Sequence, residues 1–167
     1  MRTILAFLII LSPFFSKGQE TLDKLLDLYN TKSIPYISIE ELIKIQDQVI
    51  LLDAREKEEY EVSHLKKAIH VGYDTFNPKE IVKQQIPKDS LIVVYCSLGI
   101  RSEDISEKLK NIGYKNVYNL YGGIFEWKNN DLPLVNLSNK TTNDVHVFSS
   151  EWEKWLSKGK KVYPNQN

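Results

Sequence analysis

Short, unbroken apolar runs separated by helix-like segments restrict the fold of this chain more than any other feature. Residues 49–53 and 91–95 are such runs, and each is of strand length. A strand loses its polar–apolar alternation when both of its faces are covered, as in a parallel sheet. The sequence therefore predicts a three-layer α/β domain, in which helices flank a mostly parallel central sheet.

Start and stop signals predict further elements. Ser38 and Glu41 form a capping box for a helix that ends near Ile45, and Gly113 closes a helix over 102–112. The other expected elements are helices over 21–30 and 78–84 and strands over 36–39, 68–71 and 117–120. In a parallel sheet, functional sites gather at the carboxyl ends of the strands.

The length of 167 residues suits one domain, and 42% hydrophobic with 26% charged residues is an ordinary globular composition. The 22 basic and 22 acidic residues cancel, so neither a nucleic acid nor a membrane surface is indicated as a partner. We predict a leader over residues 1–18, a helical lead-in over 19–35, the α/β domain over 36–135 and a C-terminal extension over 136–167.

The N-terminus has the pattern of a secretory signal peptide. Arg2 precedes an apolar run over residues 4–11, and small residues surround Lys17 where a signal peptidase would cut. A membrane anchor is the alternative, but Ser12-Pro13 interrupts the run well short of the ~20 residues that span a bilayer. We therefore expect cleavage, export to a periplasm or the extracellular space, and no membrane association afterwards.

The chain has one cysteine, Cys96, so no disulfide can form within it. A lone cysteine is commonly an inert core residue. Cys96, however, directly follows the apolar run 91–95 and opens a loop that leads into a helix beginning near Ser102. Gly99 allows a sharp turn there, and the backbone N–H groups of such a loop, with the helix dipole, stabilise a thiolate or persulfide anion.

At this point the chain resembles the rhodanese family over about residues 37–135. Cys96, Gly99 and Arg101 are similar to the active-site loop of single-domain rhodaneses, which has four residues between Cys and Arg. The other matching segments are Asp53-Ala54-Arg55, Glu59-Tyr60, residues 63–70, Gly113-Tyr114, and Tyr121-Gly122-Gly123 with Trp127. The family usually has glycine where this chain has Ser63 and Lys67, and proline in place of Lys66, so an altered turn is expected over 63–67.

The resemblance implies a rhodanese-type sulfurtransferase. The Cys96 thiolate would attack a small sulfane-sulfur donor, hold the sulfur as a persulfide, and pass it to a thiol or cyanide-like acceptor. The loop residues would bind the anion, and they are Ser97, Leu98, Gly99, Ile100 and Arg101. The resemblance implies no cofactor and no metal, and a protein partner is left open.

Two other functions compete with this interpretation. A rhodanese-like module could store sulfur or bind a partner through Cys96 without efficient turnover. A cysteine phosphatase or arsenate reductase has a similar architecture but needs five residues between Cys and Arg, so the shorter loop favours sulfur. Because Leu98 and Ile100 are apolar, a persulfide or polysulfide donor is as well supported as thiosulfate.

Several residues carry a structural alternative. Arg101 either contacts a donor anion or braces the loop by pairing with Asp53, Glu103 or Asp104. Asp53 and Arg55 are expected to organise loops in support of the site.

His64 and His70 are interpreted as structural, and Glu59, Tyr60 and Trp127 as packing residues. In the tail, Ser150 and Glu153 suggest a capped helix over 149–156. Its Trp152 and Trp155 are expected to cover the domain's own core, and a partner-binding face is the alternative.

Overall fold

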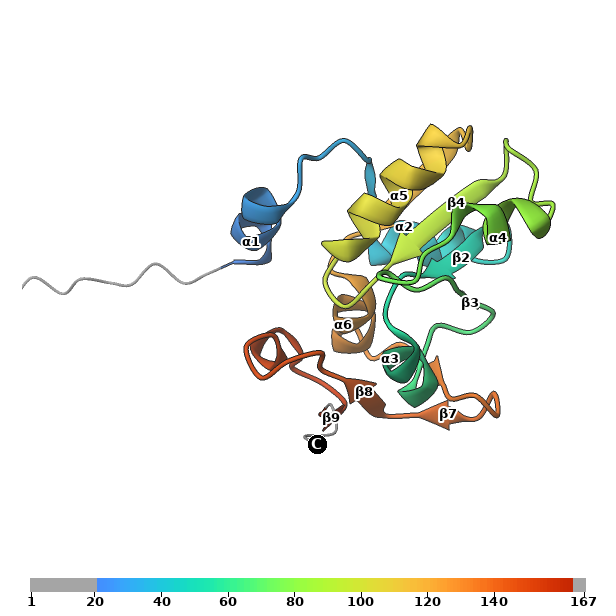
Figure 1. The fold of residues 1–167 in the computed structure, drawn as a ribbon. Helices are drawn as coiled ribbons and strands as arrows, with labels where there is room; N and C mark the ends of the chain where they lie inside the picture. Colours follow the sequence, from blue (N-terminus) through green and yellow to red (C-terminus); the bar gives the residue numbers. More distant parts are fainter. Residues whose placement is uncertain (1–20, 164–167) are drawn as a thin grey trace, which may run out of the picture.

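The computed structural model describes residues 21–163, and its centre is a five-stranded sheet (Figure 1). The strands are β1 (Tyr36–Ile37), β2 (Ile50–Asp53), β3 (Ile69–His70), β4 (Leu91–Tyr95) and β5 (Asn116–Leu120). They lie in the order β1-β5-β4-β2-β3, and every pairing is parallel. The predicted α/β class and parallel sheet are confirmed.

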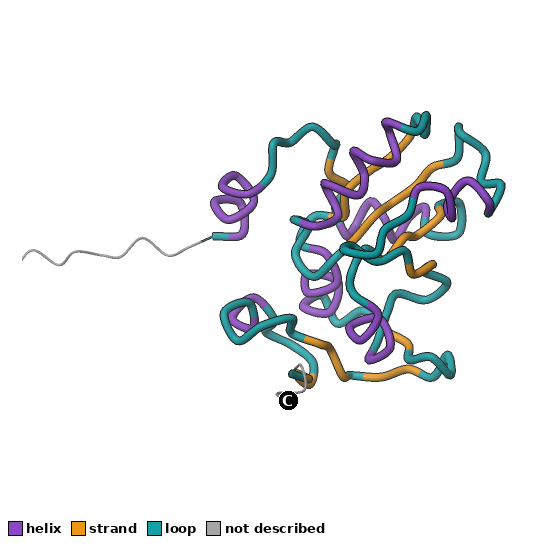
Figure 2. Tube along the Cα trace, viewed as in Figure 1, coloured by secondary structure: helices purple, strands orange, loops and turns teal. Residues whose placement is uncertain are grey.

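Helices cover both faces of the sheet, which makes three layers (Figure 2). Leu51 and Val93 face a core cluster shared with α2 and α6, while Leu52 and Val94 face a second cluster shared with α4 and α5. Alternate residues of one strand therefore enter opposite cores, which explains why the runs are apolar throughout. The helices are α1 (Leu22–Tyr29), α2 (Ile39–Ile45), α3 (Lys57–Val62), α4 (Pro78–Lys83), α5 (Arg101–Asn111) and α6 (Gly123–Asn129).

Side-chain caps are present at several of the predicted helices. The capping box of Ser38 and Glu41 is present at α2, and the Thr21 hydroxyl accepts from the backbone of Lys24 at α1. By contrast, the residue that precedes α6 is Gly122, which has a left-handed φ of 70° and no capping side chain. A helix start of that kind leaves no polar signal in the sequence.

The amino end of α6 donates hydrogen bonds to backbone carbonyls just after β4. Ile124 N donates to Cys96 O at 2.9 Å, and Phe125 N donates to Ser97 O at 3.2 Å. This approach places Gly123, with a φ of 55°, against the backbone of both residues. The helix therefore supports the loop after β4 from beneath.

The turn over 63–67 keeps a left-handed residue despite the missing glycines. Lys67 has a φ of 66°, so a lysine adopts there the conformation for which glycine is favoured. Ser63 is extended, with a φ of −168°, which any residue can adopt. A lysine in this conformation carries backbone strain that a glycine would not.

The C-terminal extension runs beneath α3 and α6 (Figure 1). It contains β7 (Thr141–Thr142), which pairs with β6 (Leu134–Val135) at the end of the domain, the parallel pair β8 (Asp144–His146) and β9 (Lys160–Val162), and the 3-10 turn η1 (Glu153–Trp155). The predicted helix over 149–156 is reduced to this 3-10 turn, and Ser150 does not cap it. The connection between the parallel strands β8 and β9 runs over residues 147–159, and η1 is its one helical segment.

Trp152 and Trp155 pack against the larger core cluster, as expected for a face that covers the domain itself. The predicted signal peptide over 1–18 lies outside the described residues. Within residues 21–163 the structure has no helix that is long and apolar enough to cross a membrane.

Gly123→Ala is expected to destabilise the protein more than Gly113→Ala. Both glycines have positive φ, 55° and 98°, so each substitution meets a backbone penalty of roughly 1–2 kcal/mol. A Cβ on Gly123 would also collide with the backbone of Cys96 and Ser97, whereas a Cβ on Gly113 has nothing within 4 Å. Urea unfolding followed by circular dichroism measures both losses, and equal losses would contradict the inferred role of the α6 start.

Candidate active site

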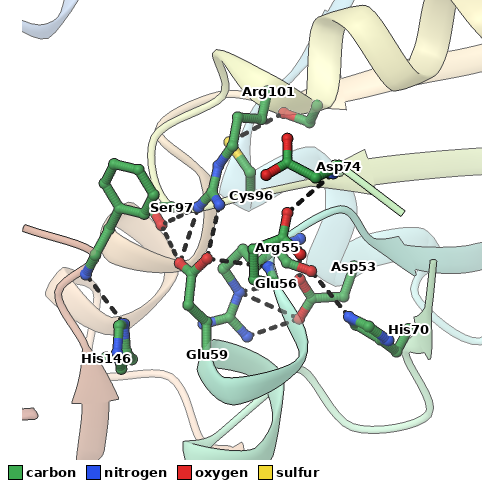
Figure 3. Close-up of polar contacts among 12 residues, drawn as sticks. Asp53, Arg55, Glu56, Glu59, His70, Asp74, Cys96, Ser97, Arg101 and His146 are labelled. Carbon is green, nitrogen blue, oxygen red and sulfur yellow. Dashed lines mark hydrogen bonds and ion pairs between the residues drawn. The ribbon is translucent and has the colours of Figure 1, made fainter. Parts of the chain in front are cut away.

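Cys96 follows β4 in the middle of the sheet, between the carboxyl ends of β2 and β5 (Figure 3). Its side chain is fully buried. The Sγ atom accepts hydrogen bonds from Gly99 N at 3.1 Å and from Ser102 Oγ at 3.5 Å. The sulfur therefore sits beneath a short loop and against the first turn of α5, where the N–H of Gly99 and the hydroxyl of Ser102 can stabilise negative charge.

Two amide side chains hold the loop over the sulfur. Asn30, at the end of α1, and Asn119, on β5, each donate from Nδ2 to Gly99 O at 2.8 Å. Gly99 has a φ of 104°, and a Cβ there would lie 3.3 Å from Leu120 O. The turn predicted at Gly99 is present, and residues far away in the sequence fix its position.

Ser102 links the sulfur to β5. Its hydroxyl lies 2.7 Å from Asn119 Oδ1 as well as 3.5 Å from the sulfur of Cys96. A hydroxyl has one proton, so it donates either to Asn119 or to the sulfur at a given moment. Sequence reasoning missed both residues, although a polar Asn119 inside an apolar strand was a visible signal, because buried polar groups need partners.

Arg101 braces the loop, but its partner is none of the three predicted acids. Its guanidinium makes a bidentate ion pair with Glu59 of α3, with N–O distances of 2.6 and 2.8 Å (Figure 3). Ser97 Oγ lies 3.0 Å from Arg101 and donates to Glu59 at 3.1 Å. The pairing with Asp53, Glu103 or Asp104 is therefore wrong.

The contact between Arg101 and Glu59 keeps both side chains charged although they are buried. Burial alone would raise the pKa of Glu59, but the hydrogen bonds and charge of Arg101 outweigh it and hold that pKa below its ordinary value. Burial likewise opposes the charge on Arg101, and Glu59 with the nearby Cys96 raises the pKa of Arg101 above its ordinary value. Both groups are therefore ionised. The interpretation of Glu59 as a packing residue is wrong, because Glu59 is the counterion of Arg101.

Asp53 and Arg55 form a second buried ion pair, at the end of β2. The Asp53 carboxylate accepts from Arg55 N at 3.0 Å and from its guanidinium at 2.6 Å. Arg55 also donates to Ser63 O at 2.6 Å, so it ties β2 to the end of α3. Within residues 21–163 neither residue contacts the sulfur directly, and their place is to support the loops around it.

The remaining candidates take part in structural contacts. His64 stacks on Tyr60 at 3.9 Å between ring centroids, and His70 Nε2 lies 2.9 Å from Arg55 O. Trp127 donates from its ring nitrogen to Pro133 O at 3.0 Å. The described part of the chain contains no group of three or more His, Cys, Asp and Glu residues that could hold a metal ion.

A model of the rhodanese-like domain matches residues 38–130, more than half of the chain. The chain therefore belongs to the rhodanese-like family. Among solved structures it is similar to a rhodanese-related protein from Thermoplasma volcanium, with a TM-score of 0.54 and 25% identity over 60% of this chain and 97% of that one. The fold is that of this family.

Curated relatives match more than half of the chain. A tRNA uridine(34) hydroxylase of Sodalis glossinidius is 40% identical over 97 residues, 55% of this chain and 28% of that protein. An adenylyltransferase and sulfurtransferase of Candida albicans is 32% identical over 115 residues, 66% of this chain and 26% of that protein. The chain thus spans about a quarter of the length of these relatives, and their names describe much longer proteins.

Glu59→Gln is expected to destabilise the protein by about 3–5 kcal/mol, because it leaves the buried Arg101 without a counter-charge. The matched control is Glu58→Gln, an exposed acid on the same helix, for which a change within about 0.5 kcal/mol is expected. Urea unfolding at neutral pH gives both values. Similar costs for the two variants would contradict the pairing.

The stabilisation by the pair of Glu59 and Arg101 is also expected to depend on pH. The pKa of Glu59 is lower in the folded protein than its ordinary value of 4.5, so the unfolded chain takes up the proton first as the pH falls. The stabilisation by Glu59 is present above that value and is lost below it, and the difference between wild type and Glu59→Gln should shrink there.

Proposed function

We propose that this protein is a sulfurtransferase that carries sulfur on Cys96. The thiolate of Cys96 attacks the outer sulfur of a persulfide or polysulfide, and the donor's S–S bond breaks with its electron pair on the departing thiolate or shortened polysulfide. An acceptor thiolate or cyanide then attacks the outer sulfur of the Cys96 persulfide. The S–S bond to Cys96 breaks, its electron pair restores the thiolate, and no net oxidation occurs.

The observation that carries the proposal is the environment of the sulfur atom. Cys96 Sγ is buried at the carboxyl end of the central strand, within reach of Gly99 N and the Ser102 hydroxyl. An inert core cysteine would have apolar neighbours, whereas neutral donors directed at sulfur favour its anion. A relative whose name includes sulfurtransferase activity, at 32% identity, is consistent with this chemistry.

The pairing of Arg101 favours sulfur-chain donors over thiosulfate. Glu59 occupies both terminal nitrogens of the guanidinium, so the positive charge beside the loop is already neutralised. Thiosulfate brings a sulfonate that would compete with Glu59 for these donors. A persulfide or polysulfide needs no such contact.

The length of the loop supports sulfur over phosphate. Four residues separate Cys96 from Arg101, and Arg101 points into its ion pair with Glu59. A phosphatase loop must surround a tetrahedral anion with several free donors, including its arginine. The function of this site is therefore proposed as sulfur transfer.

The proposal also covers the substrates, which are small molecules, and the location of the protein, which is outside the cytoplasm. A small sulfur donor and a thiol or cyanide-like acceptor fit a buried nucleophile, and the leader predicted over 1–18 directs the protein to export. The tRNA in the name of the hydroxylase relatives is not proposed as a substrate, because this chain matches 28% of such a protein and has no net positive charge.

Cys96→Ser tests the function directly. Wild type incubated with polysulfide is expected to gain the mass of one sulfur atom and to transfer it to cyanide as thiocyanate, and Cys96→Ser is expected to do neither. Intact-mass spectrometry and a colorimetric thiocyanate assay measure the two steps. A wild type that gains sulfur but never transfers it would support a storage module instead, and equal transfer by Cys96→Ser would overturn the proposal. Hydrolysis of an aryl phosphate that depends on Cys96 would favour the phosphatase.

Ser102→Ala tests the neutral donors around the sulfur. Loss of a hydroxyl beside the developing anion is expected to slow transfer about tenfold, the kinetic equivalent of one hydrogen bond. Ser106→Ala is the matched control, since its hydroxyl donates to Ser102 O and not to the sulfur. Steady-state thiocyanate formation compares the two, and equal effects would argue against a role for Ser102 at the sulfur.

A further inference from the structure

The C-terminal extension, which lies beyond the family match, forms a wall of the proposed active site. Its strand β8 packs against α3, the helix that carries Glu59. Val145, Val147 and Leu156 are buried in the core cluster that also contains Leu98 of the active-site loop. The extension is therefore built into the domain at the side where Arg101 lies.

Phe148 is held in an unusual conformation just after β8. Its φ is 64°, a left-handed value that is costly for an aromatic residue, and Ser149 N donates to Val147 O across it at 2.7 Å. Phe148 N donates to His146 Nδ1 at 3.1 Å, and its ring meets the edge of Trp152 with 5.3 Å between ring centroids. Contacts on both sides thus fix where the ring points.

The ring of Phe148 covers Arg101. The centre of the guanidinium lies 4.5 Å from the centroid of the ring, which is the geometry of a cation–π contact. Glu59 binds both terminal nitrogens, while within residues 21–163 the buried Nε of Arg101 has no hydrogen-bond partner. The ring of Phe148 therefore covers one face of the cation and Glu59 covers its terminal nitrogens, so an incoming anion meets neither a free face on that side nor a free terminal N–H pair.

We propose that Phe148 is a specificity-determining residue that shields Arg101 and so selects sulfur-chain donors against thiosulfate. This inference rests on the proposed sulfurtransferase function. Thiosulfate is a compact dianion whose sulfonate oxygens need a cation with free N–H groups. A persulfide or polysulfide has no sulfonate and presents its sulfane sulfur to Cys96 without that contact.

Both donors lead to the same intermediate. With thiosulfate, the Cys96 thiolate attacks the sulfane sulfur, the bond from that sulfur to the sulfonate breaks, and sulfite leaves with the electron pair. With a persulfide, a thiolate leaves instead. Because the persulfide on Cys96 is common to the two reactions, a change of preference between the donors reports on donor binding and not on transfer to the acceptor.

The experiment compares kcat/KM for thiosulfate and for inorganic polysulfide, with cyanide as acceptor, in wild type and Phe148→Asn. Asparagine tolerates a left-handed φ, so this change removes the ring without adding backbone strain. We expect the ratio of thiosulfate to polysulfide kcat/KM to rise about three- to thirtyfold, the factor to which a cation–π contact corresponds. The gain should appear as a lower KM for thiosulfate.

Three further variants make the result specific. Phe148→Tyr keeps the ring and should keep the wild-type ratio, and Phe148→Gly removes the ring with full backbone freedom and should reproduce Phe148→Asn. Tyr163→Asn makes the same kind of change at an exposed aromatic residue of the extension and should leave the ratio unchanged. Thermal melting of each variant shows that it is folded.

The outcomes separate the two hypotheses. An unchanged ratio in folded Phe148→Asn and Phe148→Gly, with sulfur transfer retained, overturns the role of Phe148 and leaves the proposed function standing. A wild type that transfers sulfur from neither donor overturns the proposed function, and the inference falls with it. A wild type that already prefers thiosulfate also overturns the inference.

Discussion

The buried loop after β4 must have its backbone polar groups satisfied inside the protein, and much of the surrounding architecture follows from that constraint. Ser97 and Leu98 are almost completely buried, so water cannot form hydrogen bonds with their peptide groups. The amino end of α6 donates hydrogen bonds to the carbonyls of residues 96 and 97, and the side-chain amides of Asn30 and Asn119 donate to the carbonyl of Gly99. Helix α1, strand β5 and helix α6 are thus positioned by one loop, which they in turn hold in place for chemistry.

The sequence predicted the parallel sheet because its central strands are covered on both faces and therefore lack alternation. It predicted α2 because Ser38 and Glu41 carry the cap in their side chains. It did not predict α6, which follows a left-handed Gly122 and whose first N–H groups are used by the chain at the end of β4. The helix predicted in the C-terminal extension is shorter in the structure for a related reason. The path of the extension depends on the parallel pairing of β8 with β9, which local sequence patterns do not encode.

At the site, the cysteine loop was predictable and its partners were not. The strand, Gly99 and the following helix are local features, and together they place Cys96. The partners are separated in sequence from the residues they hold: Glu59 by 42 positions from Arg101, Asn30 by 69 and Asn119 by 20 from Gly99. Local reasoning selected Asp53, Glu103 and Asp104 as candidates for Arg101, but Asp53 is taken by Arg55 next to it.

The distribution of charge has a consequence for the chemistry. Each of the two buried arginines has its own acid, as a buried cation requires, so the ion pairs brace the loops and contribute little net positive potential at the sulfur. Stabilisation of an anion on Cys96 then depends on neutral donors, the N–H of Gly99 and the hydroxyl of Ser102. In the proposed mechanism these two donors serve the sulfur itself, whereas a sulfonate or phosphate brings oxygens that must compete for guanidinium groups that are already paired. The same arrangement that makes the loop rigid therefore also limits the anions that it can accept.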